Sequence, residues 1–231
     1  MFTRLQCKDE AEWLEKRKLG IGGSSCSSII GMNPYQTNVE YWRIKVGLQE
    51  SKDLSNNPNV IYGKNAEELI REFVKLDYRD YLSIYHSEYE LLIRDDKPFI
   101  RSSLDGEIEV LQDCIILGKK LVKGMKGILE IKTTEPMRSV SLESWKNDNV
   151  PTNYHCQRLH YLLTTDYDFH LLRCDFRKYD RDKQTWVHWS KDYCILKDEV
   201  KDQLDYLEEE ETKFWNDNIL GNKEPNLIIN I

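Results

Sequence analysis

The chain has 231 residues, of which 40% are apolar and 11% aromatic, a composition that fits one globular domain and excludes an intrinsically disordered chain. No apolar run reaches the length of a membrane span and the N-terminus has no apolar signal core, so we expect a cytoplasmic protein with no membrane partner. The net charge of −7 is unusual for a protein that handles nucleic acid, but all of the excess lies in residues 192–218, which carry ten acids and three lysines.

Helical segments are predicted in the N-terminal third of the chain. Two of them begin with a capping box, in which a polar side chain and a glutamate three residues later satisfy each other's free backbone groups. These pairs are Asp9 with Glu12 and Thr37 with Glu40. The predicted ranges are a helix at 9–18, a short piece ending at 30 after a glycine- and serine-rich turn at 20–25, a helix at 37–47, and a strongly periodic helix from Gly63 after a polar loop at 50–60.

The middle of the chain changes to the two-residue period of β-strands. The order of elements predicts an α/β or α+β protein with a central mixed sheet flanked by helices, and no linker divides residues 1–231. The predicted strands are 85–93, 99–110, 113–117 and 128–134, followed by a helix at 151–163 and a terminal hairpin at 169–176 and 185–189.

The charged segments and the cysteines are also informative. Residues 192–218 have apolar residues at helical spacing, which predicts an amphipathic helix whose acidic face is solvated and turned away from any DNA. Four lysines between 119 and 126 either meet phosphates or are merely solvated, and the sequence leaves both interpretations open. The six cysteines are scattered without a Cys-x-x-Cys pair, which predicts free buried thiols rather than disulfides or a structural zinc site.

Glu130 and Lys132 lie two residues apart on the predicted apolar strand at 128–134, so their side chains share one face. Opposite charges on a buried strand must be exposed, pair with each other or take part in chemistry. Asp105 lies in another predicted strand, just before Gly106, where it could complete a metal site. Both features have a plain alternative, because the two charges could form an ordinary ion pair and Asp-Gly is a common hairpin turn.

Two further polar side chains could surround these charges. Glu67 lies at the edge of the apolar stripe of its helix and could turn toward the sheet or pair with a surface lysine. Gln157 lies between two tyrosines on its helix and could orient water or be a structural amide. Phosphodiester hydrolysis needs an activated water and positive charge beside the phosphate, and Mg²⁺ and Mn²⁺ prefer hard oxygen ligands. The set is therefore predicted to hold one or two Mg²⁺ or Mn²⁺ ions through Asp105, Glu130, Glu67 and the Ile131 carbonyl, with Lys132 orienting the water.

Five short runs of the sequence resemble those of the YqaJ-type viral recombinases and phage lambda exonuclease of the PD-(D/E)XK nuclease superfamily, and they occur in the family's order. Each run is weakly diagnostic alone, but five in order are fairly specific. They span about residues 13–175, so the terminal hairpin and acidic helix at about 176–218 fall mostly outside. The matching runs are Arg17–Ser24, Gly63–Glu67, Ser103–Gly106, Leu129–Lys132 and Val150–Gln157.

The resemblance implies a restriction-endonuclease-like core within a single nuclease domain over 1–231. Family members typically digest one strand of linear duplex DNA from the 5′ end with Mg²⁺, and they leave 3′ single strands for a partner annealing protein. Several are ring-shaped trimers, which implies a homo-oligomer here. By similarity, the catalytic residues are Asp105, Glu130 and Lys132 with support from Glu67 and Gln157, and the 5′ phosphate is held by Arg17, Ser24, Gly22 and Gly23.

The leading hypothesis is thus a metal-dependent DNA exonuclease of phage recombination type, acting in the host cytoplasm if a phage encodes it. One alternative is an endonuclease or single-strand nuclease of the same superfamily. A different class of protein, a catalytically silent DNA-binding or assembly protein, would be favoured by loss of a metal ligand. All of the expected metal ligands are present in the sequence.

Overall fold

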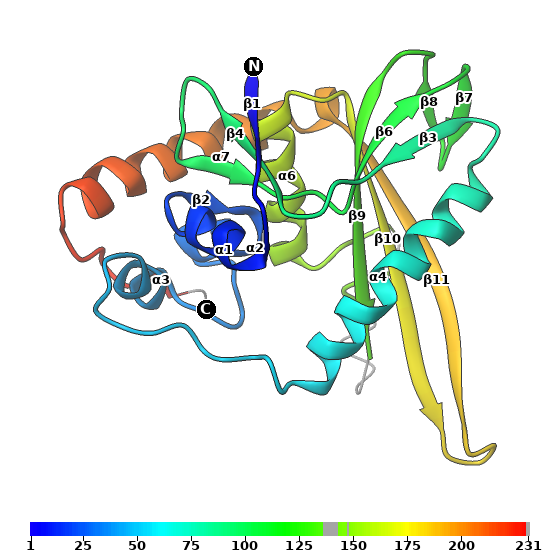
Figure 1. Ribbon diagram of the computed structural model, residues 1–231, viewed down its shortest axis with the longest axis horizontal. Helices are drawn as coiled ribbons and strands as arrows, with labels where there is room; N and C mark the ends of the chain where they lie inside the picture. Colours follow the sequence, from blue (N-terminus) through cyan, green and yellow to red (C-terminus); the bar gives the residue numbers. More distant parts are fainter. Residues whose placement is uncertain (136–142, 147, 230–231) are drawn as a thin grey trace.

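The computed structural model of the protein contains two main β-sheets surrounded by helices (Figure 1) and describes residues 1–135, 143–146 and 148–229. The first sheet has the strand order β1-β4-β5-β2 and the second β11-β10-β9-β6-β3, beside a small β7-β8 hairpin. The strands are β1 Phe2–Gln6, β2 Ile21–Gly22, β3 Leu82–Tyr85, β4 Glu90–Arg94, β5 Ile100–Ser102, β6 Gly106–Val110, β7 Cys114–Ile116, β8 Lys119–Leu121, β9 Lys126–Thr134, β10 Phe169–Asp180 and β11 Thr185–Leu196. The helices are α1 Glu10–Lys18, α2 Gly23–Ile29, α3 Asn38–Lys45, α4 Pro58–Asp77, α6 Thr152–Thr165 and α7 Lys201–Lys213, with a 3-10 turn Lys197–Val200 and a π-helical turn Phe214–Leu220 at the two ends of α7.

The long hairpin predicted between 85 and 110 is bent, so its two halves lie in different sheets. β3 pairs with β6 in the five-stranded sheet, and β4 pairs with β5 in the four-stranded sheet. The chain leaves strand geometry at 86–89 and at 103–105, and Tyr89 adopts a positive φ of 57°. The prediction of a mixed α/β fold is confirmed, with the five-stranded sheet as its central mixed sheet, and the four-stranded sheet is an addition to it. The break at 103–105 is where Asp105 lies.

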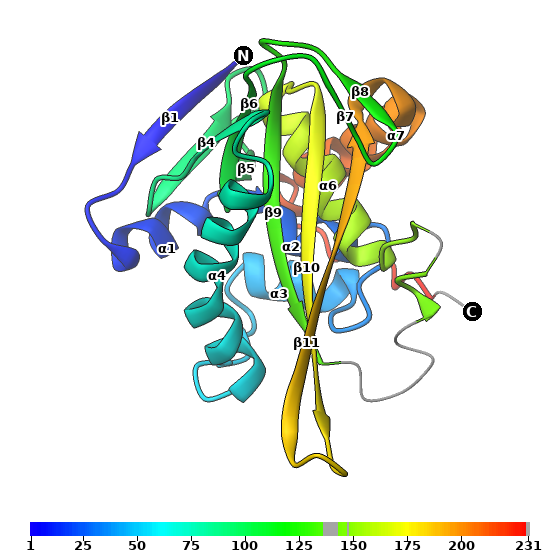
Figure 2. The same ribbon diagram turned by 90° about the vertical axis from the view of Figure 1, so that its right-hand side faces the viewer.

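The helix starts follow capping chemistry. The capping boxes at Thr37 and Glu40 and the Asp9 cap of α1 are present as predicted. The long helix α4 begins five residues earlier than Gly63, because Asn57 caps it and Pro58 fits the first helical position. The two views show α4 and α6 on opposite sides of β9 (Figures 1 and 2).

The core and the charged segments differ in part from expectation. The apolar stripe of α7 is buried as predicted, but Glu211 on the same helix is fully buried too. Two of the four lysines from 119 to 126 form ion pairs, Lys119 with Glu199 and Lys126 with Glu109. None of the six cysteines forms a disulfide, as predicted. No helix in the described ranges has the length and apolarity needed to cross a membrane.

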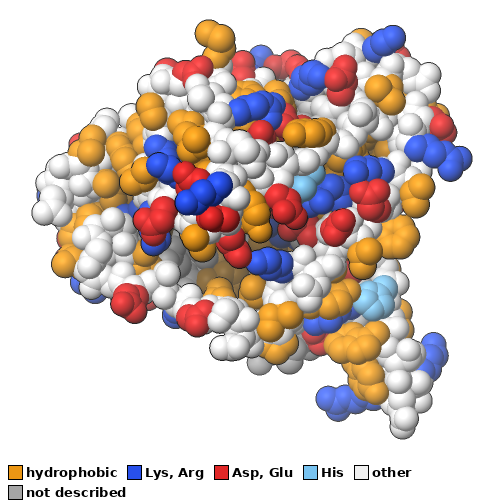
Figure 3. Space-filling view, in the orientation of Figure 1, with side chains coloured by type: hydrophobic (Ala, Val, Ile, Leu, Met, Phe, Trp, Pro, Cys, Tyr) orange, Lys and Arg blue, Asp and Glu red, His pale blue; other side chains and the backbone are white. Residues whose placement is uncertain are grey.

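β10 and β11 form an arm that extends well past the rest of the sheet (Figure 2) and is longer than the hairpin predicted at 169–176 and 185–189. Hydrophobic side chains gather along it in the space-filling view (Figure 3), and Trp186 and Trp189 are about 40% exposed. Its strands continue from the edge of the core beside β9, with which β10 pairs in parallel.

Leu162→Ala tests the contribution of α6 to the core. Leu162 is fully buried between α2, α6 and α7, so its truncation should lower the free energy of unfolding by about 2–5 kcal/mol. The matched variant Leu69→Ala, at a 64% exposed position of α4, should change it by about 0.5 kcal/mol or less. Urea denaturation of both proteins measures the difference, and equal effects would contradict this packing.

Candidate active site

β9 carries the two charges that the sequence places on one face. Glu130 is 2% exposed, and its Oε1 accepts a short hydrogen bond from the Lys132 ammonium. Lys132 also lies over the ring of Tyr154 on α6, 5.3 Å from the ring centroid. The face toward α4 carries Leu129 and Ile131, which belong to the hydrophobic core. The predicted separation of faces is therefore present, and the two charges contact each other.

Asp105 lies where β9 extends beyond its neighbour β6. The β6–β9 pairing ends at Gly106 opposite Leu129, so the next part of β9 has no strand on that edge. The Asp105 carboxylate takes the strand's place, because Oδ2 accepts the Ile131 N–H at 2.7 Å. The N–H and C=O groups of one strand residue point to the same edge. The Ile131 carbonyl therefore faces the same edge as Asp105, as a metal ligand at this position would require.

Glu67 reaches the same edge from α4 through Arg71. The Arg71 guanidinium donates to Glu67 Oε1 at 2.5 Å and to the backbone carbonyl of Asp105 at 2.6 Å. Arg71 is 7% exposed, so it is a buried connector between the helix and the strand break. The sequence analysis missed Arg71, although its position four residues after Glu67 is the spacing of a helical ion pair.

His86 is a second neighbour of Asp105 that the sequence analysis missed. It is half-buried, and its Nδ1 has no hydrogen-bond partner among the residues that the structure describes. Burial and then the charge of Arg71 lower its pKa, and the nearby charge of Asp105 opposes this shift.

The three carboxylates destabilise one another's charged forms. Burial, followed by repulsion from Asp105, raises the pKa of Glu130 to about 8 and that of Glu67 to about 7. Burial also raises the pKa of Asp105. Lys132 loses solvation by burial, but the charges of Glu130 and Asp105 outweigh this effect and raise its pKa. Two cations, Lys132 and Arg71, therefore face three acids.

The oxygen atoms at this site fit a divalent cation. Glu130 Oε2 is buried and accepts no hydrogen bond from any described residue, whereas Oε1 is occupied by two donors. Two further carboxylates and a backbone carbonyl lie at the same edge of β9. Such a group of hard oxygen donors is typical of Mg²⁺ or Mn²⁺ sites.

Gln157 connects this cluster to α2. Its amide donates to Glu130 Oε1 and to the Tyr161 hydroxyl, both at 2.8 Å. The ring of Tyr161 packs on Gly23, where an added Cβ would lie 2.4 Å from a ring carbon. Glycine is thus required at position 23 by a close approach. Both tyrosines predicted around Gln157 are present, Tyr161 in contact with it and Tyr154 beside Lys132.

The predicted phosphate-binding residues lie at the end of α1, in β2 and in the first turn of α2. Arg17 stacks on Trp13 at 4.2 Å, and its guanidinium lies 3.9 Å from where a Cβ on Gly22 would be. Ser24 is exposed in the first turn of α2, beside Gly23. Gly23 packs on Tyr161, which bonds to Gln157, so this stretch reaches the carboxylate cluster through two side chains. The structure therefore brings together the predicted carboxylates, Lys132 and Gln157, and it places Arg17 and Ser24 on the two helices that flank Gly22.

Two more cations, Lys45 and Arg101, lie beside Arg17. The Lys45 ammonium donates to the carbonyls of Gly20 and Lys18, and Arg101 donates to the carbonyls of Lys16 and Pro98. Burial, then repulsion by Arg17 and Arg101, lowers the pKa of Lys45 to about 8. Within the described ranges, none of the three cations forms an ion pair with a carboxylate. The sequence analysis missed both residues, since nothing in their spacing relates them to Arg17.

Known proteins resemble this chain in sequence and in fold. The uncharacterized protein YqaJ of Bacillus subtilis strain 168 is 29% identical over 227 residues, which cover 94% of this chain and 58% of that protein. The chain thus spans little more than half the length of this curated relative. The alkaline exonuclease LHK-Exo of Laribacter hongkongensis has a similar fold, with a TM-score of 0.54, 18% identity, and 88% of this chain and 90% of that chain covered. Its complex with dAMP gives a TM-score of 0.51 at 17% identity, covering 89% and 96% of the two chains.

These solved structures share the restriction-endonuclease-like fold with this chain. At 18% and 17% sequence identity, the likeness supports a common fold alone. The sequence comparison gives stronger support for the family than the structural one does. The model of the YqaJ-like viral recombinase domain matches residues 12–168, which include Arg17, the carboxylate cluster and Gln157. The chain belongs to the YqaJ-like viral recombinase domain family.

Proposed function

We propose that this protein is a metal-dependent exonuclease of phage recombination type that hydrolyses one strand of linear duplex DNA from its 5′ end. The observation that carries the proposal is the cluster of Asp105, Glu130 and Lys132 at the free edge of β9, with an unpartnered oxygen of Glu130 among the described residues. Family membership supports the recombination context, and the similar fold of the alkaline exonuclease LHK-Exo supports the reaction type.

In this proposal the acids hold the metal and Lys132 acts on the reacting groups. Asp105, Glu130, Glu67 and the Ile131 carbonyl would bind Mg²⁺ or Mn²⁺, which supplies an activated water and charge stabilisation at the phosphate. Gln157 occupies Glu130 Oε1 and leaves Oε2 for the cation. Lys132, held by Glu130 and the face of Tyr154, orients the attacking water and stabilises negative charge that develops on the phosphate.

The cations beside α2 would hold the 5′ end. Arg17, Lys45 and Arg101 present positive charge that no described carboxylate pairs with, and Gly22 and Gly23 leave the backbone accessible to an anion. A terminal phosphate carries more charge than an internal one, so it suits a site with several cations. Ser24 offers a hydroxyl donor at the same turn.

We further propose that residues 1–231 act as one nuclease domain. By resemblance, its partners would be double-stranded DNA, a single-strand annealing protein and two further copies of the chain. The direction of digestion, the trimer and the choice of Mg²⁺ over Mn²⁺ all rest on the resemblance. The experiments below concern the site itself.

Lys132→Ala tests the proposed catalytic site. We expect Mg²⁺-dependent degradation of linear duplex DNA to slow by about 10²–10⁴-fold, because the variant loses the group that orients water and stabilises charge. DNA binding in Ca²⁺ should change by only about threefold or less, since one of several cations is removed. Lys126→Ala is the matched control, because Lys126 lies on the same strand but pairs with Glu109 at the other end. Its rate should equal that of the wild type.

Degradation is measured as release of mononucleotides from a labelled linear duplex, with closed circular DNA and a chelator as parallel samples. Equal rates for wild type and Lys132→Ala would show that the proposed site is wrong. Cleavage of the closed circle would instead replace the exonuclease assignment by an endonuclease.

Arg17→Gln tests recognition of the DNA end. The wild type should degrade a 5′-phosphorylated duplex faster than a 5′-hydroxyl duplex. In the variant, the ratio of these two rates should be about tenfold smaller, as expected for the loss of one charged hydrogen bond to phosphate. Lys18→Gln is the control, since neighbouring Lys18 pairs with Glu15 on the exposed side of α1. An unchanged preference in Arg17→Gln would remove Arg17 from the phosphate site.

The lowered pKa of Lys45 predicts how anion binding depends on pH. Lys45 is a cation below about pH 8 and neutral above it, so its attraction for an anion is present at pH 7 and lost as the pH rises through 8. The probe is sulfate, whose charge is constant in this range, and the readout is its stabilisation of the protein against heat relative to chloride at equal ionic strength. The apparent affinity for sulfate should fall by roughly threefold or more between pH 7 and 9.

Lys45→Met keeps the length of the side chain without its charge. It should bind sulfate more weakly at pH 7 and show a flat response to pH. A wild-type protein whose sulfate response is flat over the same range would contradict the place of Lys45 in the cation cluster.

A further inference from the structure

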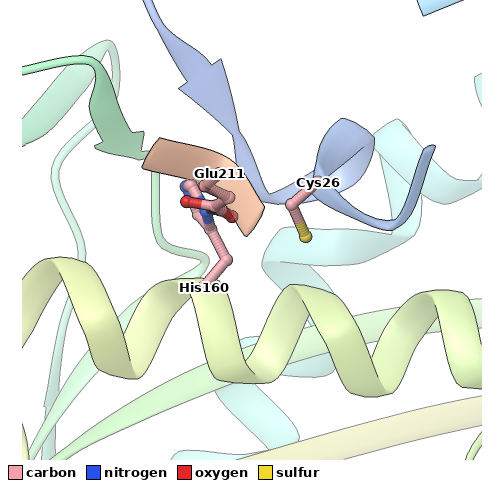
Figure 4. A group of neighbouring side chains, drawn as sticks. All are labelled: Cys26, His160 and Glu211. Atoms are coloured by element: carbon pink, nitrogen blue, oxygen red, sulfur yellow. Dashed lines mark hydrogen bonds and ion pairs between the residues drawn. The ribbon is translucent and has the colours of Figure 1, made fainter. Parts of the chain in front are cut away.

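Cys26, His160 and Glu211 meet inside the protein, on the side of α6 away from the arm (Figure 4). They come from α2, α6 and α7 respectively, and all three side chains are fully buried. One potential ligand atom from each residue lies within 4.8 Å of the other two. None of these residues takes part in the proposed nuclease site.

The hydrogen bonds of His160 show what this cluster lacks. Its Nε2 lies 2.9 Å from the backbone carbonyl of Arg101, which can only accept, so this nitrogen carries a hydrogen. Its Nδ1 lies 2.7 Å from Glu211 Oε1. In the neutral ring, Nδ1 presents a lone pair to a carboxylate oxygen. Two acceptors in contact need a positive species between them, either a proton or a metal ion.

Buried oxygen atoms around the cluster also lack partners. Glu211 Oε2 and the Tyr41 hydroxyl are both buried, and neither has a hydrogen-bond partner in the part of the chain that the structure describes. Tyr41 belongs to the same group of packed core residues as Cys26. Unsatisfied buried oxygens are rare in folded proteins and usually indicate an ion or water that binds there.

We propose that Cys26, His160 and Glu211 bind one Zn²⁺ ion, with the Tyr41 hydroxyl or a water molecule as the fourth ligand. Thiolate, imidazole and carboxylate are the ligands zinc prefers, and Mg²⁺ does not favour the first two. Binding displaces two protons, one from the Cys26 thiol and one shared by His160 and Glu211. The two negative ligands then balance the charge of the ion, so the buried site is neutral. The Arg101 carbonyl fixes the ring so that Nδ1 faces the metal, as a partner of a zinc-bound histidine does.

The position of the ion would connect two parts of the protein. Glu211 lies on α7, outside the matched range 12–168, whereas Cys26 lies on α2 just after Gly23 and Ser24. His160 lies one turn from Gln157 on α6. Zinc would thus hold α7 against the two helices that shape the phosphate-binding turn and orient Glu130. It would be a structural ion, and not part of the hydrolytic site.

Metal analysis of the full chain, purified without chelator, tests the proposal. We expect about one zinc ion per chain in the wild type and less than about 0.1 in Cys26→Ala. Cys7→Ala is the matched control, because Cys7 is also buried but lies at the other end of α1 from this cluster, and it should keep its zinc. Protein refolded with Co²⁺ should show a thiolate-to-cobalt absorption band that is present in Cys7→Ala and lost in Cys26→Ala.

Asp105→Asn separates this site from the nuclease site. It should abolish DNA degradation and keep both the zinc and the cobalt band, so either proposal can fail without the other. A wild-type protein that holds less than about 0.1 zinc ions after refolding with Zn²⁺ would overturn the zinc site without any variant. Zinc content in Cys26→Ala equal to that of the wild type would overturn it as well.

Discussion

The rest of the candidate site depends on how Glu130 is buried. A carboxylate in the interior needs hydrogen bonds or a counter-charge, and Glu130 receives both on the same oxygen, from Lys132 and from Gln157. This leaves its second oxygen without a described partner, at an edge that already carries Asp105 and Glu67. The residues around Glu130 thus fix its orientation without neutralising the cluster. Without a cation, carboxylates crowded in this way lower the stability of the fold. Sites that bind a cation commonly carry this cost.

The same hydrogen-bond chain relates the carboxylates to the segment between α1 and α2. Gln157 bonds to Tyr161, Tyr161 packs on Gly23, and Gly23 begins the helix that carries Ser24. A shift of α2 would therefore move Tyr161 and disturb the donor that holds Glu130. The proposed zinc ion would act on the same joint, because two of its ligands lie on α2 and α6 close to these residues. In the proposed function, this packing would couple recognition of a DNA end to cleavage of the nearby bond.

The sequence was sufficient for residues whose role follows from local spacing. The alternation of Glu130 and Lys132 against Leu129 and Ile131 predicts their faces, and the capping boxes predict where α1 and α3 begin. The sequence was not sufficient where a contact with a distant part of the chain determines the structure. The alternation from Tyr85 to Ile93 continues through the bend, so only the pairing of β3 with β6 and of β4 with β5 divides that strand between two sheets.

Distant contacts also explain the residues that were missed. Glu211 has the sequence neighbours of a solvated acid, but His160 draws it into the core. Arg71, Lys45 and Arg101 each donate to a backbone carbonyl far along the chain, those of Asp105, Gly20 and Lys16 respectively.

Electrostatics gives the strongest reason to treat the carboxylate cluster and the cation cluster as one site. Three acids surround Lys132 and Arg71 at the edge of β9, and the pKa values of the acids are raised. Three cations lie around the turn before α2, and the pKa of Lys45 is lowered. Each cluster alone is unfavourable, and the two have opposite signs. Among the described residues, none of these three cations forms an ion pair with any of the three acids. A ligand that satisfies both must present a divalent cation at one end and a multiply charged anion at the other. A metal-bound DNA strand with a terminal 5′ phosphate has this charge distribution, whereas a metal ion or a free anion would relieve only half of the repulsion.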